Sequence, residues 1–95
     1  MSGVEAVLPA GITHYRGSNG EDIRALAAAL EENTTLTSID LSNNGIGPNG
    51  AASLAAALEK NSTLISINLS YNGIGEEGAT CLAAALEKNT TLTSI

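Results

Sequence analysis

The hydrophobic pattern of residues 36–63 changes its period once, from that of a strand to that of a helix. Ile39 and Leu41 alternate with polar neighbours, which is typical of a strand with one buried face. In residues 51–60, apolar side chains recur three and four positions apart, and alanine, the strongest helix former, is frequent. The pattern therefore predicts a short strand followed by a helix.

The same pattern forms an internal repeat. Residues 36–63 align with residues 64–91 without a gap, and 20 of the 28 positions are identical. Leu26, Leu30 and Asn33 lie one period before their counterparts in the first full copy, so an upstream copy is half visible. A repeat of this length predicts a stacked architecture. We divide the chain into an irregular N-terminal cap or flank at residues 1–24 and leucine-rich repeats at residues 25–95, with a partial repeat at 25–35, full repeats at 36–63 and 64–91, and a truncated repeat at 92–95.

A polar turn containing Asn44 and Gly45 joins the predicted strand to the predicted helix. Gly45 allows a backbone conformation that most residues avoid. An Asn-Gly pair between apolar runs is also a signal for a two-residue hairpin. We reject the hairpin because the segment that follows has the helical period. The chain must instead cross to a helix and return to a parallel strand.

Charges and a proline mark the predicted helices. Pro48 suits a first helical turn, where its missing N–H costs nothing. Glu76 and Glu77 lie near the start of the next helix, and Lys60 and Lys88 lie near helix ends. Both signs agree with the helix dipole.

Capping residues complete these boundaries. Asn61 and Asn89 follow the two full helices, and we expect them to end the helices in the left-handed conformation. Ser18 and Glu21 have the spacing of a capping box ahead of the upstream helix.

The complete motif reads Leu36-x-x-Ile39-x-Leu41-x-x-Asn44-x-Ile46-x-x-x-Gly50-x-x-x-Leu54-x-x-x-Leu58-x-x-Asn61. It resembles the long, helix-bearing leucine-rich repeat of ribonuclease inhibitors. Similar repeats occur in NOD-like receptors, in the GTPase-activating protein for Ran and in bacterial effectors. The resemblance implies an α/β solenoid, with parallel strands on the concave face and helices on the convex face. It also implies structural roles for Leu41 and Leu69 in the core, and for Asn44 and Asn72 as buried side chains that bond backbone groups at the turn.

The charge balance narrows the class of partner. The chain has four Lys and Arg residues against ten Asp and Glu residues, a net charge of −6. Such a surface repels phosphates, so it argues against nucleic acids and anionic membranes and leaves a protein as the expected partner. Cys81 is the single cysteine and cannot form an intramolecular disulfide. Residues 1–10 do not have the features of a signal peptide, so we expect a cytoplasmic protein, or one delivered into a host cytosol if it is an effector.

The outward-facing positions of the strands and their turns are the candidate binding surface. Most are small and polar, and a solvated face without a ligand is an equally good interpretation, since binding hot spots favour Trp, Tyr and Arg. Tyr71 is the best single candidate, with a partly buried tyrosine packed on a neighbouring turn as the alternative. The candidates are Thr37, Asp40 and Asn43 in one repeat and Ile65, Asn68 and Tyr71 in the next.

Candidate chemistry is weak elsewhere. His14 lies in the N-terminal flank, without the nucleophile and orienting partner that a general base needs. Cys81 takes the place of Ser53 on a helix and lacks an electropositive setting. Glutamates near the helix ends are explained by a solvated convex face. We therefore expect no catalytic residue, no cofactor and no metal ligand.

Three functional hypotheses remain. The first is a non-enzymatic protein-protein interaction module. The second is a regulator of a partner enzyme, such as an activator of a small GTPase, although the arginines, Arg16 and Arg24, both lie outside the clear repeats. The third is a self-assembling fragment, because Ile95 ends the sequence inside a strand motif and an exposed strand edge is a template for pairing.

Overall fold

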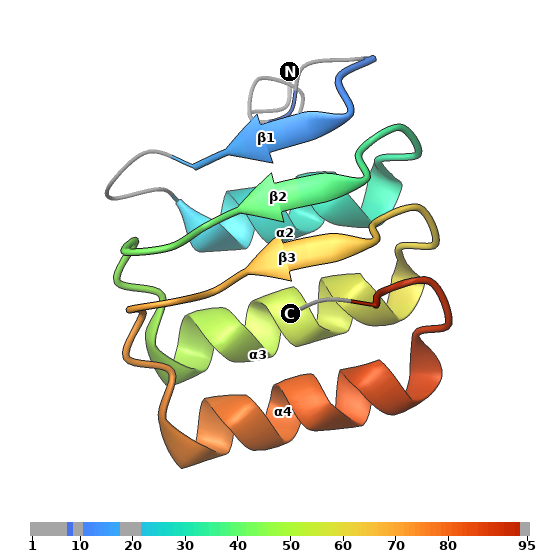
Figure 1. Ribbon diagram of the computed structural model, residues 1–95. Helices are drawn as coiled ribbons and strands as arrows, with labels where there is room; N and C mark the ends of the chain where they lie inside the picture. Colours follow the sequence, from blue (N-terminus) through green and yellow to red (C-terminus); the bar gives the residue numbers. More distant parts are fainter. Residues whose placement is uncertain (1–7, 9–10, 18–21, 94–95) are drawn as a thin grey trace.

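The computed structural model describes residue 8, residues 11–17 and residues 22–93. Strands and helices alternate along the chain and form two layers, with the strands on one side and the helices on the other (Figure 1). The predicted α/β fold with parallel strands is confirmed. The elements are β1 (His14–Arg16), α2 (Ile23–Glu32), β2 (Ser38–Asp40), α3 (Gly47–Lys60), β3 (Ser66–Asn68) and α4 (Gly75–Lys88).

The three strands form one parallel sheet in the order β1-β2-β3. Tyr15, Ile39 and Ile67 are aligned across it, and the two isoleucines are 1% exposed. Because successive side chains on a strand point to opposite faces, the residues on either side of this row face away from the helices. Each turn of the stack therefore adds one buried and two outward-facing side chains to the sheet.

The N-terminal flank, which we expected to be irregular, contains strand β1. His14–Arg16 pairs with Ser38–Asp40, so these two strands are 24 residues apart, whereas β2 and β3 are 28 residues apart. The shorter turn, and Tyr15 in the place of an isoleucine, hid this strand from the repeat pattern. Helix α2 also begins at Ile23, inside the predicted flank.

The core is a column of aliphatic side chains between the two layers, and its cover is uneven. Leu36, Leu41, Leu54 and Leu58 are fully buried in the first full repeat. The second full repeat is more open, because Leu69 and Leu86, the counterparts of Leu41 and Leu58, are only half-buried. Near-identical repeat sequences therefore have different surroundings.

A buried asparagine joins the turns of the two full repeats. The Oδ1 atom of Asn72 accepts hydrogen bonds from the backbone N–H groups of Asn44 (2.7 Å) and Ile46 (3.3 Å). Its Nδ2 atom donates to the carbonyl groups of Leu41 (2.8 Å) and Leu69 (3.0 Å). Gly45, at the centre of the connected turn, has a φ of 65°, as its position predicts. One side chain thus satisfies polar groups of two successive repeats.

The prediction that Asn61 and Asn89 end their helices in the left-handed conformation is wrong. Their φ angles are −77° and −85°, with extended backbone. The Oδ1 atom of Asn61 accepts hydrogen bonds from the N–H groups of Thr63 (2.9 Å) and Leu64 (2.8 Å), while its Nδ2 atom donates to the carbonyl of Leu30 (2.8 Å). This bonding turns the chain back toward the sheet with ordinary backbone angles.

The start of α2 also differs from the expectation. Ser18 and Glu21, the predicted capping box, lie outside the described residues. The N-cap is Asp22, whose Oδ1 atom accepts a hydrogen bond from the N–H group of Ala25 (3.2 Å). An aspartate is among the best residues for this role.

The other helix-boundary predictions are confirmed. Pro48 lies in the first turn of α3, and Glu76 and Glu77 lie in the first turn of α4. Lys60 and Lys88 lie in the last turns of these helices. Each lysine also forms an ion pair of 3.7 Å with a glutamate of the preceding helix, and such exposed pairs contribute little to stability.

The repeat register predicts a large cost for removing Leu64, which is fully buried. We expect Leu64→Ala to lower the free energy of unfolding by about 2–5 kcal/mol in urea denaturation, as for other buried leucines. The matched control is Leu92→Ala one repeat later, where the side chain is only half-buried and the loss should be smaller. Equal losses for the two variants would contradict the uneven cover of the core.

The close approach of α3 and α4 at Gly78 predicts a second difference. A methyl group at Gly78 would overlap Cγ2 of Ile74 and lie 2.9 Å from Cβ of Ala51, on the neighbouring helix. We expect Gly78→Ala to cost about 1–3 kcal/mol of unfolding free energy through overpacking. Gly50→Ala is the matched variant one repeat earlier, and its new methyl group meets Cγ2 of Ile46 at 2.7 Å but has more room toward the neighbouring helix. A smaller cost at Gly78 than at Gly50 would rule out this account of the helix packing.

Candidate protein-interaction surface

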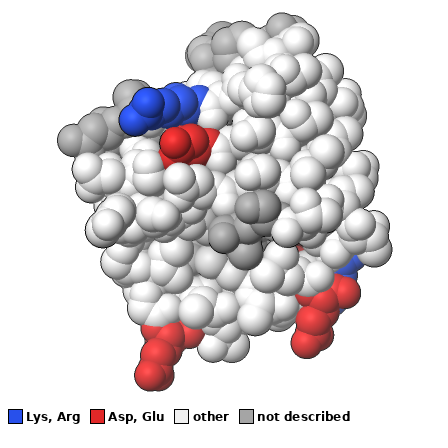
Figure 2. Space-filling model, in the orientation of Figure 1, with Lys and Arg blue, Asp and Glu red and all other residues white. Residues whose placement is uncertain are grey.

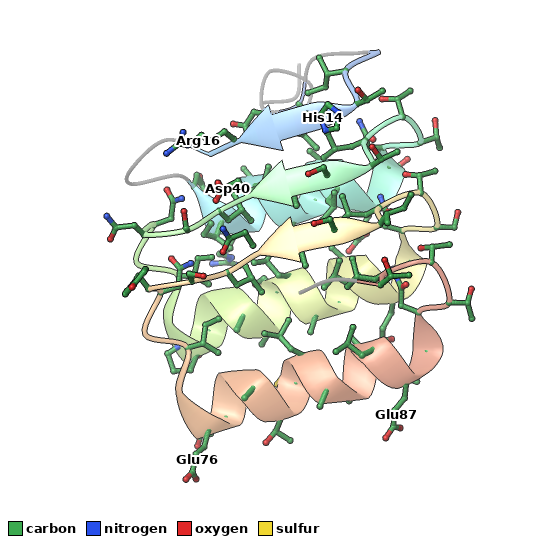
Figure 3. The ribbon with its side chains drawn as sticks, viewed as in Figure 1. His14, Arg16, Asp40, Glu76 and Glu87 are labelled. Atoms are coloured by element: carbon green, nitrogen blue, oxygen red, sulfur yellow. The ribbon has the colours of Figure 1, made fainter. Side chains whose placement is uncertain are left out.

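The outward side chains of β1, β2 and β3 form a polar surface, which we call the strand face. The register places Arg16, Asp40 and Asn68 in one row across the three strands. His14 begins a second row, which continues with serines on β2 and β3. Neighbouring strands lie about 4.8 Å apart, so the side chains of each row are close neighbours. Figure 3 shows His14, Arg16 and Asp40 at the β1–β2 end of this face.

Charge is sparse on the strand face. Figure 2 shows one basic and one acidic group together near β1 and β2, where Figure 3 labels Arg16 and Asp40, and further acidic groups along the helix edge. Hydrogen bonds from the backbone and the side chain of Ser42 hold the pKa of Asp40 below its usual range, and the charge of Arg16 adds to this effect. Asp40 therefore stays ionised, as one fixed negative charge on a largely neutral surface.

The structure arranges the six predicted binding residues as three neighbouring pairs. Thr37 adjoins Ile65 at the start of the strands, where the N–H of Ile65 donates to the carbonyl of Thr37 (2.8 Å). Asp40 is aligned with Asn68 at the ends of β2 and β3. Asn43 and Tyr71 occupy equivalent places in successive turns that leave the strands. The pairs lie at the start, the end and the exit turn of the strands and do not enclose a cavity.

Tyr71 is 89% exposed, so the alternative of a partly buried tyrosine packed on a neighbouring turn is wrong. Its φ is 58°, and that of its counterpart Asn43 is 60°. Asparagine adopts this left-handed region with little strain, whereas a bulky side chain there is unusual and costs energy. The turn geometry imposes a conformation that suits Asn43 and strains Tyr71.

Ile65 is the second exposed large hydrophobic residue of the described chain, with 47% of its surface accessible. Both Ile65 and Tyr71 belong to residues 64–91, and they replace Thr37 and Asn43 of the preceding repeat. The two repeats are otherwise nearly alike, so these substitutions give the second one apolar groups at both ends of β3. Comparison of the repeats identifies both positions, but the left-handed backbone of Tyr71 becomes evident only in the structure.

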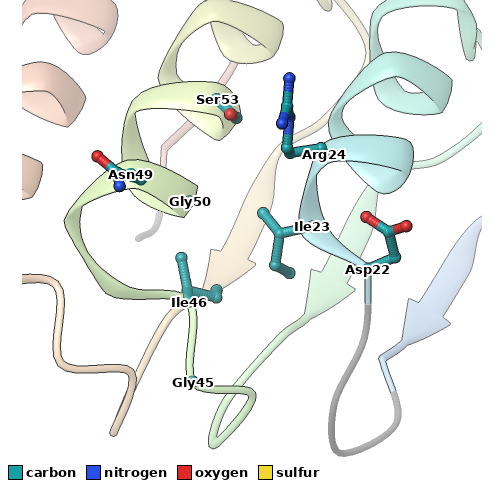
Figure 4. A pocket seen from close by; sticks show the side chains of 8 residues that line it. All are labelled: Asp22, Ile23, Arg24, Gly45, Ile46, Asn49, Gly50 and Ser53. Carbon is teal, nitrogen blue, oxygen red and sulfur yellow. The ribbon is translucent and has the colours of Figure 1, made fainter.

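A hollow between α2 and α3 was not foreseen from the sequence. Its volume is about 570 Å³, and Arg24 of α2 and Ser53 of α3 line it from opposite helices (Figure 4). It exists because α3 begins at Gly47, a full turn earlier in the repeat than Ile23, where α2 begins. Its remaining lining residues are Asp22, Ile23, Gly45, Ile46, Asn49 and Gly50.

A second hollow, of about 390 Å³, lies between β3 and α4. Leu69, Ile74 and Leu82 give it an apolar wall, and Asn68 and Ser70 border it on the sheet side. It adjoins the strand face at the more open of the two full repeats.

Other chemically active residues do not converge in the described part of the chain. Cys81 is half-buried in α4, and His14 lies exposed on β1. Within residues 11–17 and 22–93 and at Leu8, no group of three or more His, Cys, Asp or Glu side chains could hold a metal ion. None of the described helices is long and apolar enough to cross a membrane.

Two solved structures share this architecture. The first, described as "Leiomodin-1 Actin-Binding Site 2 (ABS2)", has a TM-score of 0.81 and 30% sequence identity over 96% of this chain. This chain spans 55% of the length of that one. The second, a tropomodulin C-terminal domain from Caenorhabditis elegans, has a TM-score of 0.59 and covers 98% of this chain, which spans 81% of it. Its sequence identity is 16%, so it supports the fold alone.

The match to a family model agrees with the observed repeats. No curated protein sequence matches the chain. The family model described as "Leucine Rich repeat" matches residues 32–55 and 60–83, about half of the chain, and each match spans the end of one helix, a strand and the first part of the next helix. The chain belongs to the leucine-rich repeat proteins.

Proposed function

We propose that the chain is a non-enzymatic protein-binding module, and that its partner contacts the strand face and the exit turn of residues 64–91, with Tyr71 as the main anchor. The observation that carries this proposal is the conformation of Tyr71. A tyrosine that is 89% exposed contributes little to the fold, and its φ of 58° adds strain. Strain of this kind is concentrated at functional sites. Tyrosine is also among the residues most enriched at binding hot spots.

The rest of the surface supports binding over catalysis. Ile65 adds a second apolar group, and Asp40 adds a fixed charge beside the uncharged side chain of Asn68. An apolar anchor with polar surroundings is the usual composition of a protein interface. A catalytic site would need different reactive groups that converge on one point.

Actin is the first partner that we propose. The leiomodin structure is described as an actin-binding site, and its 30% identity extends over 96% of this chain. The cytoplasmic location expected from the sequence is part of this proposal. Membership of the ribonuclease-inhibitor-like subfamily stays a prediction.

The GTPase-activator hypothesis has weaker support than binding alone. An activating arginine must reach into the partner's site. Arg16 neighbours Asp40 on the strand face, and Arg24 lines the hollow between α2 and α3. We therefore expect no stimulation of GTP hydrolysis. Self-association through the open side of residues 64–91 is the other alternative, and light scattering over a concentration series distinguishes it from a monomer.

Actin binding is tested by co-sedimentation with filaments and by titration of fluorescently labelled monomeric actin. We expect a saturable interaction with at least one of the two forms. If neither form binds, actin is the wrong partner. If the chain scatters light as a dimer or larger assembly and the dimer alone binds, self-association belongs to the function.

The internal repeat supplies the variant that tests the anchor. Tyr71→Asn gives the second turn the residue of the first. We expect the free energy of unfolding to rise by about 1 kcal/mol, because asparagine relieves the left-handed strain. We expect binding to weaken at least about tenfold, because a hot-spot side chain is lost.

The matched control is Ala83→Ser on the exposed surface of α4, which should leave both quantities nearly unchanged. Ile65→Thr makes the corresponding exchange at the other end of β3 and should weaken binding less than Tyr71→Asn. A Tyr71→Asn variant that binds as tightly as the unchanged chain would show that Tyr71 is not the anchor.

A further inference from the structure

Each of the two buried asparagines at the strand exits is followed by glycine. The pairs Asn44–Gly45 and Asn72–Gly73 lie at the same place in successive repeats. A glycine leaves its backbone nitrogen unhindered by a side chain, so that nitrogen readily attacks the side-chain amide carbon of a preceding asparagine. In an unfolded chain, both pairs are therefore reactive deamidation sites with closely similar sequences.

The fold holds the amide of Asn72 away from this reaction. Asn72 is 4% exposed, and its amide makes five hydrogen bonds of 2.7–3.3 Å to backbone groups of both full repeats. Two of the five remain within its own repeat, to the carbonyls of Leu69 and Ser70. The side chain would have to break its bonds to the preceding repeat before it could turn toward Gly73. Reaction therefore requires the turn to open.

Opening favours Asn72 over Asn44. Residues 64–91 are the less covered repeat, since Leu69 and Ile74 are half-buried whereas their counterparts Leu41 and Ile46 are buried. Regions with fewer buried contacts open at a lower free energy than the rest of a protein. When this repeat separates, Asn72 loses its bonds to the preceding turn, but Asn44 keeps those from its Nδ2 atom to the carbonyls of Leu41 (3.0 Å) and Ser42 (3.1 Å).

We propose that Asn72 is a conformationally gated modification site: opening of residues 64–91 exposes it to deamidation, and the product prevents the repeat from closing again. The backbone nitrogen of Gly73 loses its proton and bonds to Cγ of Asn72. The bond from Cγ to Nδ2 breaks, and Nδ2 leaves as ammonia with that proton. Water then opens the cyclic imide at either carbonyl, which yields aspartate or isoaspartate.

The product no longer fits the closed turn. In the native turn, Nδ2 donates to three carbonyls at 2.8–3.1 Å, on Leu41, Leu69 and Ser70. A carboxylate has no proton to donate and would place a negative oxygen against these carbonyl oxygens in a buried site, which is strongly unfavourable. Isoaspartate also lengthens the backbone at the turn by one carbon atom. Both products therefore favour the open repeat.

The first experiment compares reaction rates at the two asparagines of the purified chain. The chain is incubated at mildly alkaline pH, folded in buffer or unfolded in urea, and peptide mapping by mass spectrometry measures deamidation at each position. We expect similar rates at Asn44 and Asn72 in urea. In the folded chain we expect Asn72 to react at least about tenfold more slowly than in urea, and Asn44 to react more slowly still. Equal rates at Asn72 in the two states, or faster reaction at Asn44 in the folded chain, would overturn the proposal.

The second experiment tests the consequence. Asn72→Asp reproduces one product, and Asn49→Asp is the matched control at another Asn-Gly pair, where the side chain is exposed in the first turn of α3. By circular dichroism and hydrogen exchange, we expect Asn72→Asp to lower the melting temperature and to remove protection from residues 64–91. Asn49→Asp should retain both, since a negative charge suits the start of a helix. A folded Asn72→Asp variant with normal protection would overturn the gating.

Discussion

The side chain of Asn72 is the interaction on which the stack depends most directly. A strand that leaves the sheet through a tight turn exposes backbone N–H and carbonyl groups that neither a strand nor a helix can satisfy, and unpaired polar groups are costly when buried. The amide of Asn72 supplies both an acceptor and donors to such groups on two successive repeats. Because the amide bridges neighbouring repeats, it stabilises their contact as well as the turn.

The opposite end of the strands uses the same residue type in a different way. Asn33, Asn61 and Asn89 each follow a helix, and each Oδ1 atom accepts hydrogen bonds from the two N–H groups that lead into the next strand. The Nδ2 atoms of Asn61 and Asn89 reach back to the preceding repeat. The parallel sheet is therefore held at both ends by amide side chains, and the three-residue strands between them need few bonds of their own.

The sequence pattern predicts the parts of the fold in which local and repeated signals agree. The strand–helix alternation, the parallel sheet and Pro48 in the first turn of α3 follow from periodicity alone. Strand β1 does not, because its spacing of 24 residues to β2 lies outside the repeat. At the candidate surface, the exposed positions could be proposed from the alternation of strand residues. The left-handed backbone of Tyr71 could not, because tyrosine has no preference for it and the turn alone imposes it.

The close packing at Gly78 also concerns the shape that the molecule offers to a partner. Neighbouring strands are about 4.8 Å apart, whereas packed helices are usually about 8–10 Å apart. This difference bends a stack of such units toward its strand side. Small residues where α3 meets α4, such as Gly78 against Ala51, allow the helices to approach and reduce the difference. The size of side chains buried between the helices thus sets the curvature of the opposite surface, and with it the radius of the partner that can lie against the strands.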